Sequence, residues 1–235
     1  MNILAIGAHP DDLEILCAGT LARYAAQGQA VFMGIFTSGD MGDLEVPPDK
    51  LARIRQSEAE ASAAVLRARL LWVGVTDELV FPNEAQRRLM IDLLRQADPD
   101  VIITHSPNDY HPDHRYVSQL VFDSYFQKGL PHLPGQERPA CRFGKAVIYY
   151  MDTLAGTDFS PTEYVDISTV IETKTRMLQC HQSQFKAMSE LAHTNLLDMM
   201  QIQGRFRGLA AGCRYAEAFR KLEAYQRGLT HRLLP

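Results

Sequence analysis

Short apolar segments alternate with helical patterns through the first half of the chain. The apolar runs are bounded by glycine, proline or polar residues, which is typical of strands buried on both faces. Between them, apolar side chains recur at helical spacing, as in Ile15, Leu21 and Tyr24, which predicts amphipathic helices. The expected strands are residues 3–6, 30–37, 70–75 and 101–104, and the expected helices are residues 14–27, 50–69 and 84–96.

This order of elements predicts the class of fold. Strands that alternate with helices through short connections form βαβ units with right-handed crossovers. We therefore expect an α/β protein with a Rossmann-like, mostly parallel sheet and flanking helices. Beyond residue 129 the pattern loosens, and it predicts a strand at 146–151 and helices at 168–182 and 215–227. No repeat or linker divides the chain, so a single domain over residues 1–235 is expected.

Composition and charge narrow the classes of partner. The 235 residues are 46% hydrophobic and 22% charged, and the formal net charge is −4, which is typical of a globular protein without a basic patch. We expect no nucleic acid partner, and no membrane insertion because no apolar run approaches ~20 residues. The short apolar start of the chain predicts a first strand rather than a signal peptide. The expected partners are small molecules or further copies of this chain.

The cysteines indicate the compartment. The four are scattered and form no CxxC pair, so they match neither a zinc finger nor a disulfide framework. Free thiols in a reducing compartment are the interpretation that fits them, and we expect a cytoplasmic protein. The four residues are Cys17, Cys141, Cys180 and Cys213.

Unusual polar clusters follow the first four predicted strands. In open parallel sheets, ligands bind beyond the carboxyl ends of the strands, so we expect the functional site at that edge. A dinucleotide site would need GxGxxG after the first strand, and Gly7-Ala8-His9 does not supply it. The clusters are residues 8–12, 38–43, 77–78 and 106–114.

Two of these clusters share one design. His9-Pro10-Asp11-Asp12 and His111-Pro112-Asp113-His114 each place a histidine three residues before another ligand-type side chain, and this spacing puts both side chains on one face of a helical turn. Capping explains acidic residues and proline at a helix start, but it does not explain the histidines. Imidazole and carboxylate are zinc ligands, and a catalytic site takes three of them and leaves one position for water. Two such clusters after parallel strands therefore predict a metal site.

The two motifs closely resemble those of the LmbE-like, or PIG-L, zinc N-deacetylases. Further stretches look like landmarks of the bacterial thiol-pathway branch, so the resemblance spans nearly the whole chain. The first motif covers residues 8–14, and the further stretches are residues 55–58, 165–168, 174, 183–185 and 215–219.

The resemblance implies a role for each residue of the two motifs. It assigns one Zn²⁺ per chain to His9, Asp12 and His114, with Fe²⁺ as the alternative metal. Asp11 becomes the general base, and His111 becomes the general acid or oxyanion partner.

For three other candidate site residues, the sequence allows two interpretations each. Arg55 either reaches a substrate hydroxyl or anionic group or pairs with Glu58 on a solvated helix face. Asp77 either contacts sugar hydroxyls or belongs to a turn. Asp113 either orients a histidine or complements a helix dipole, and His105 is expected to be structural.

The resemblance and the polar residues together indicate a GlcNAc-type N-acetyl amino sugar as substrate. Arg55, Asp77, Asp40 and Asp43 are expected to form a polar rim. Apart from Tyr110 and Tyr116, no aromatic residues of the kind that line a lysine-deacetylase tunnel flank the motifs. Tyr110 stands where many bacillithiol-pathway members carry arginine, and the missing cation argues against a malate-bearing substrate. By resemblance we also expect a homo-oligomer, with a hexamer as the specific form.

Two rival functions remain open at this point. His9, Asp11 and His114 also satisfy the two-histidine, one-carboxylate triad of non-haem Fe(II) enzymes. A sugar-binding protein that retains a metal site is the non-catalytic rival.

Overall fold

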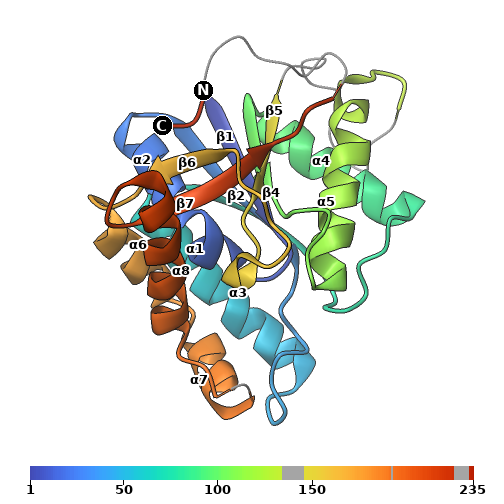
Figure 1. Cartoon of the computed structure of the whole chain (residues 1–235). Helices are drawn as coiled ribbons and strands as arrows, with labels where there is room; N and C mark the ends of the chain where they lie inside the picture. The colour runs from blue at the N-terminus through green and yellow to red at the C-terminus, as the bar shows by residue number, and fades with distance from the viewer. Residues whose placement is uncertain (134–145, 192, 225–232) are drawn as a thin grey trace.

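The computed structural model describes residues 1–133, 146–191, 193–224 and 233–235. Its centre is a seven-stranded sheet in the order β3-β2-β1-β4-β5-β7-β6, flanked by helices on both faces (Figure 1). Five strands are parallel to one another: β1 (Asn2–Gly7), β2 (Ala30–Thr37), β3 (Arg69–Val75), β4 (Val101–Thr104) and β5 (Val147–Met151). The expected α/β fold with a mostly parallel sheet is confirmed.

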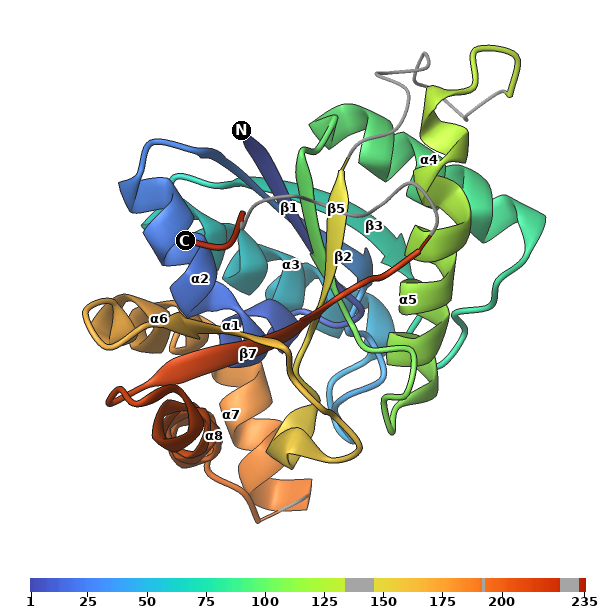
Figure 2. The ribbon, with the colours of Figure 1, turned by 45° about the horizontal axis from the view of Figure 1, so that its top comes forward.

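The central strands are apolar on both faces because both faces are covered. In β1, Ile3 and Ala5 pack into one core cluster, whereas Leu4 and Ile6 pack into the other. Helices α1 (Asp12–Leu16), α2 (Ala18–Ala26), α3 (Pro48–Val65), α6 (Ile171–Leu178) and α8 (Leu196–Ala211) contribute to the first cluster. Helices α4 (Glu84–Ala97) and α5 (Pro112–Tyr125) contribute to the second, on the opposite face (Figure 2).

Two predicted helices have different bounds in the structure. The helix expected at residues 14–27 is divided into α1 and α2 at Cys17, whose φ of −145° is not helical. The helix expected at 50–69 ends at Val65, because Arg67 has a φ of 55° and Arg69 already pairs with Phe32 in the sheet. The short helix α1 matters for function, since it begins at Asp12.

The prediction of a C-terminal helix at residues 215–227 is wrong. Residues Ala216–Lys221 form strand β7, which is antiparallel to β5 and to β6 (Glu163–Asp166). The sequence analysis predicted neither β6 nor β7. Alanine, glutamate and lysine favour helices, but Phe219 and Ala218 face opposite core clusters, which is strand alternation. Residues 225–227 of that expectation lie outside the described residues.

Helices α7 (Gln182–Leu191) and α8 lie at the carboxyl edge of the parallel strands, together with the loop after β2 (Figure 1). The helix expected at residues 168–182 corresponds to the shorter α6. A short 3-10 turn, η2 (Leu154–Gly156), follows β5 at the same edge. Among the described residues, none of the helices combines the length and apolar character that crossing a membrane needs.

Candidate active site

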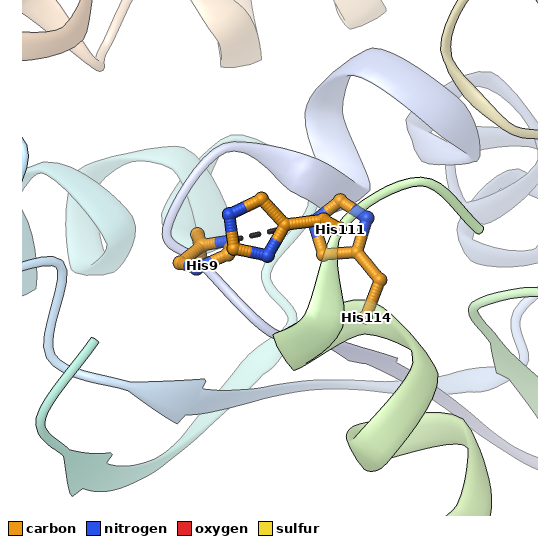
Figure 3. A group of neighbouring side chains, drawn as sticks. All are labelled: His9, His111 and His114. Carbon is orange, nitrogen blue, oxygen red and sulfur yellow. Dashed lines mark hydrogen bonds between the residues drawn. The ribbon is translucent and has the colours of Figure 1, made fainter. Parts of the chain in front are cut away.

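The two predicted motifs meet at the carboxyl ends of the neighbouring strands β1 and β4. His9 lies between β1 and α1, and His111 is the N-cap of α5, where its Nδ1 accepts a hydrogen bond from the amide of Asp113 at 3.2 Å. Proline at the first position of α5 suits this start. The imidazole rings of His9, His111 and His114 lie against one another (Figure 3).

The three residues expected to bind metal present their donor atoms to one another. His9 Nδ1 lies 3.3 Å from His114 Nε2 and 3.5 Å from Asp12 Oδ2, and His114 Nε2 lies 3.3 Å from Asp12 Oδ1. Ligand atoms about 2.0–2.1 Å from a tetrahedral zinc ion lie about 3.3 Å from each other. The spacing and the donor set therefore fit a zinc ion.

In His9 and His114, the ring nitrogen that points away from the expected metal position lies against a carboxylate. His9 Nε2 lies 3.3 Å from Asp113 Oδ2, and His114 Nδ1 lies 3.1 Å from Asp109 Oδ1. Such partners fix the ring and direct its other nitrogen inward. The sequence analysis raised this role for Asp113 but missed Asp109, because nothing in the spacing of a loop residue two places before His111 predicts its contact with His114.

The electrostatics of this cluster favour positive charge. Burial lowers the pKa of His9, but Asp113 and Asp12 outweigh it and raise the pKa to about 10. Burial is likewise outweighed at His114, where Asp12 and Asp109 raise the pKa to about 9. Surroundings that stabilise a cationic ring at this point are equally suited to a divalent cation.

Other groups of ligand-type side chains occur among the described residues. They are His9, His111 and His114; Asp12, His105 and His114; and Glu78, His111 and Asp113. His105 is fully buried, and its Nε2 accepts a hydrogen bond from the amide of Ala8 at 2.9 Å. The same Nε2 lies 3.1 Å from Oδ2 of Asp12, so the ring supports the expected ligand Asp12, which favours the structural role for His105.

Asp11 lies between the expected ligands and Arg55. Its carboxyl group is buried, and it has a φ of 123°, a conformation that costs a non-glycine residue free energy and recurs at functional sites. Burial raises the pKa of Asp11 to about 6, although Arg55 acts in the opposite direction. Arg55 Nη2 lies 3.5 Å from Asp11 Oδ1 and donates to the carbonyl of Pro10 at 2.7 Å.

Arg55 is therefore not a solvated residue paired with Glu58. It is buried, and Glu58 instead accepts hydrogen bonds from Ser183. The guanidinium also lies against Gly39, where an added Cβ would come within 2.6 Å of Arg55 Cδ. Only glycine fits there, since its φ is also 69°.

Asp77 organises the loop after β2. Its Oδ1 accepts from the amide of Gly39 at 2.8 Å, and its own amide donates to Asp40 at 2.9 Å. Asp43 accepts from two amides within the loop. Neither Asp40 nor Asp43 lines the cavity; Met41 and Gly42 do so from this loop. The expected rim is wrong at these two positions, because their carboxylates hold backbone amides.

The sequence analysis placed Glu78 in the polar cluster at residues 77–78 but gave it no role. Its Oε1 lies 3.3 Å from His111 Nε2, and its φ is 63°. The pKa of His111 is lowered, first by burial and then by His9 and His114, whereas Glu78 raises it. An exposed glutamate in a turn gives no sequence signal for such a contact.

A cavity of about 240 Å³ joins these residues. Its polar wall holds the expected metal ligands, Asp11, Arg55, Asp77, Glu78 and His111. Its other wall is apolar and includes side chains from three elements of the C-terminal half. These are Leu154, Met188, Leu196 and Met199, and Tyr110 borders the mouth with 61% of its surface exposed.

Comparison with known proteins assigns the family. Residues 4–125 match the family described as GlcNAc-PI de-N-acetylase, or PIG-L. The chain is 30% identical over 240 residues to diacetylchitobiose deacetylase of Thermococcus kodakarensis, and the match covers 93% of this chain and 82% of that protein. This chain therefore belongs to the PIG-L family, as its two motifs indicated.

The family fold is shared more widely than one reaction. N,N′-diacetylchitobiose deacetylase from Pyrococcus horikoshii superposes with a TM-score of 0.79 at 28% identity, covering 94% of this chain and 83% of that one. A 4-oxalmesaconate hydratase of Pseudomonas putida is 24% identical over 197 residues, covering 78% of this chain and 74% of that protein. The reaction must therefore be argued from the site.

Proposed function

We propose that this protein is a zinc-dependent hydrolase that removes the N-acetyl group from a GlcNAc-type amino-sugar compound. The observation that carries the proposal is the set of donor atoms of His9, Asp12 and His114, which lie 3.3–3.5 Å apart beside a cavity that also contains a buried carboxylate. Membership of the PIG-L family and 30% identity to a diacetylchitobiose deacetylase support it. We propose that residues 1–235 act as one domain with one zinc ion.

Zinc suits the donor set better than Fe²⁺ does, because the distances between the donor atoms match the ligand-to-ligand distances around a tetrahedral zinc ion. The iron triad considered from the sequence used Asp11 as its carboxylate. In the structure, Asp12 rather than Asp11 lies against both His9 and His114, which argues against that particular triad. Bound zinc would polarise the amide carbonyl and lower the pKa of a bound water molecule to about 7.

The residues of this chain perform the proton transfers. Asp11 takes a proton from the attacking water, and Arg55 holds its carboxylate in place. Asp11 then passes that proton to the leaving nitrogen, while His111, whose Nδ1 accepts from the amide of Asp113, donates a hydrogen bond from Nε2 to the carbonyl oxygen as negative charge develops there. Water adds to the acyl carbon, the carbon–nitrogen bond breaks, and the products are acetate and the free amine.

We propose that Arg55 and Asp77 also contribute to substrate binding. Both line the cavity, and Asp77 does so while holding the loop that presents Met41 and Gly42. Asp113 acts through His9, whose ring it orients.

The hydratase relative defines the competing reaction. Its name indicates a substrate rich in carboxylates, and such a substrate requires cations. Among the described residues that line the cavity, Arg55 is the one Lys or Arg side chain, and it is engaged by Pro10, Gly39 and Asp11. The cavity thus favours an uncharged amide substrate.

Assembly and location are part of the proposal. We propose a cytoplasmic homo-oligomer, specifically a hexamer, with no nucleic acid partner and no membrane insertion. Light scattering at micromolar concentration tests the assembly, and a monomer would contradict it.

The reaction is tested by acetate release. Zinc-loaded protein incubated with a panel of N-acetylglucosaminides is expected to release acetate and free amine in equal amounts, and a chelator is expected to abolish the release because zinc would activate the attacking water. Binding of a glycoside without acetate release at any zinc concentration would favour a sugar-binding protein instead.

A further inference from the structure

Glu78 is held in a strained turn at the edge of the catalytic cavity. The amide of Leu79 donates to the carbonyl of Thr76 at 3.2 Å, so residues 76–79 form a turn after β3 with Glu78 as its third residue. Its φ of 63° favours glycine or asparagine at that position and costs a glutamate free energy. The amide of Glu78 donates to Asp113 Oδ2 at 2.8 Å, which fixes the turn beside the two motifs. Backbone strain of this kind beside a catalytic centre indicates a functional role.

The turn directs the Glu78 carboxylate toward the reacting groups. Its Oε1 lies 3.3 Å from His111 Nε2, the nitrogen that donates to the carbonyl oxygen in the proposed reaction. The His111 ring in turn packs against His9, with ring centroids 4.7 Å apart. A GlcNAc-type sugar carries its N-acetyl group on C2, so the substituents of C1 and C3 are next to the amide. A substrate whose amide is at the metal therefore brings one of these substituents toward Glu78.

The other carboxylates that line the cavity are already engaged. Asp12 is an expected metal ligand, and Asp11 lies against Arg55. Both oxygens of Asp77 accept from backbone amides of the loop after β2. All three residues are buried, whereas 59% of the Glu78 side chain is exposed. Among the described residues of the cavity, Glu78 thus supplies the carboxylate that an entering substituent can reach.

Positive side chains near this edge do not offset that charge. Arg55 is the one Lys or Arg among the described residues that line the cavity, and its guanidinium is engaged within the protein. Arg115 follows the second motif, but it donates to two backbone carbonyls of the loop before α5 at 2.8 Å and does not line the cavity. Tyr110 and Gln184, which also line it, are uncharged residue types. An entering substituent therefore meets negative charge at Glu78.

We propose that Glu78 selects substrates by charge, and that it favours an N-acetyl amino sugar with an amine on a neighbouring substituent over one with a carboxylate there. The inference rests on the proposed function and deepens it by naming the substrate class, a cationic amino-sugar compound. Coulomb attraction stabilises an ammonium group beside the carboxylate, whereas a second carboxylate is repelled. The amide that reacts is uncharged in both cases.

The experiment compares kcat/KM for three N-acetylglucosaminides whose anomeric oxygen carries a 2-aminoethyl, a 2-hydroxyethyl or a carboxymethyl group. They are similar in size and differ in charge at pH 7, where the amine is protonated and the carboxylate is ionised. We expect the order amine, alcohol, carboxylate, with roughly a tenfold difference between the first and the last at low ionic strength, because charges about 5 Å apart change binding several-fold even in a water-like dielectric. High salt is expected to reduce the difference, since exposed charges are screened.

Two variants remove the charge of Glu78. In Glu78→Gln protein, the ratio of kcat/KM for the amine to that for the carboxylate is expected to fall toward one. This ratio cancels any change in the chemical step that the substrates share. Glu78→Gly is expected to give the same result, and glycine suits the φ of 63°, so this variant removes the side chain without straining the turn.

Glu84→Gln is the matched control for loss of a negative charge. Glu84 is an exposed glutamate in the first turn of α4, where it pairs with Arg88 at 2.7 Å, and it does not line the catalytic cavity. Its substitution is expected to keep the ratio. A ratio near one in the parent protein, a preference for the carboxylate, or a preference for the amine that both Glu78 variants retain would overturn the inference.

The same assay separates the inference from the proposed function. Hydrolysis of the hydroxyethyl glycoside without any preference for charge would overturn the inference and leave the proposed function standing. Failure of the zinc-loaded protein to hydrolyse any of the three glycosides would contradict the proposed function, and with it the inference.

Discussion

His114→Ala protein is expected to lose most of its bound zinc. The substitution removes one of three proposed protein ligands, and it also leaves Asp109 without the ring that it contacts at 3.1 Å. Because three ligands are the usual number at a catalytic zinc site, two residual ligands should bind the ion far more weakly. Elemental analysis after gel filtration should find about one zinc per chain in the parent protein and much less in the variant.

His132→Ala is the matched control for metal binding. His132 is an exposed histidine after α5 and belongs to none of the ligand-type groups. Its substitution should leave the zinc content unchanged. If His114→Ala protein kept a full complement of tightly bound zinc, the ligand set would have to be another one, such as His9 with His111.

Asp11→Asn protein is expected to retain zinc and to lose turnover. Asparagine keeps the size and the neighbouring Arg55 but cannot accept a proton, so kcat should fall by about 10²–10⁴-fold. The measurement is kcat for acetate release at saturating substrate, together with zinc content. Loss of activity together with loss of zinc would instead place Asp11 among the ligands.

Asp49→Asn provides the comparison for this charge removal. Asp49 lies in the first turn of α3 and pairs with Arg53 at an exposed position. Its neutralisation should leave kcat unchanged. Full activity in Asp11→Asn protein would mean that another residue accepts the proton.

The first half of the fold was predictable because its signals are local. Strands buried on both faces, such as β1, are continuous apolar runs, and Asn83 caps α4 with a hydrogen bond to Gln86. The strand β7 was not predictable from propensity. Its Glu217 is buried against Lys174 and the amide of Gly19, and those tertiary partners override the helix preference of the segment.

The candidate site divides in the same way. The two motifs were visible because each places a histidine three residues before another ligand-type side chain, although the structure shows that His111 also caps α5. Asp109 and Glu78 contact the histidines through loop conformations that no spacing indicates. The apolar wall from η2 and α8 was invisible for a further reason, since Leu154 and Met199 come near His9 only through the order of the sheet.

The central claim is hydrolysis of an N-acetyl amino sugar, and the ratio of two specificity constants tests it most directly. The kcat/KM of the zinc-loaded protein would be measured for an N-acetylglucosaminide and for an acetyl-lysine peptide, by release of acetate. We expect a clear preference for the glycoside, because a polar site discriminates by about 1–3 kcal/mol for each buried group left unpaired by the wrong substrate. A preference for the peptide would contradict the amino-sugar assignment.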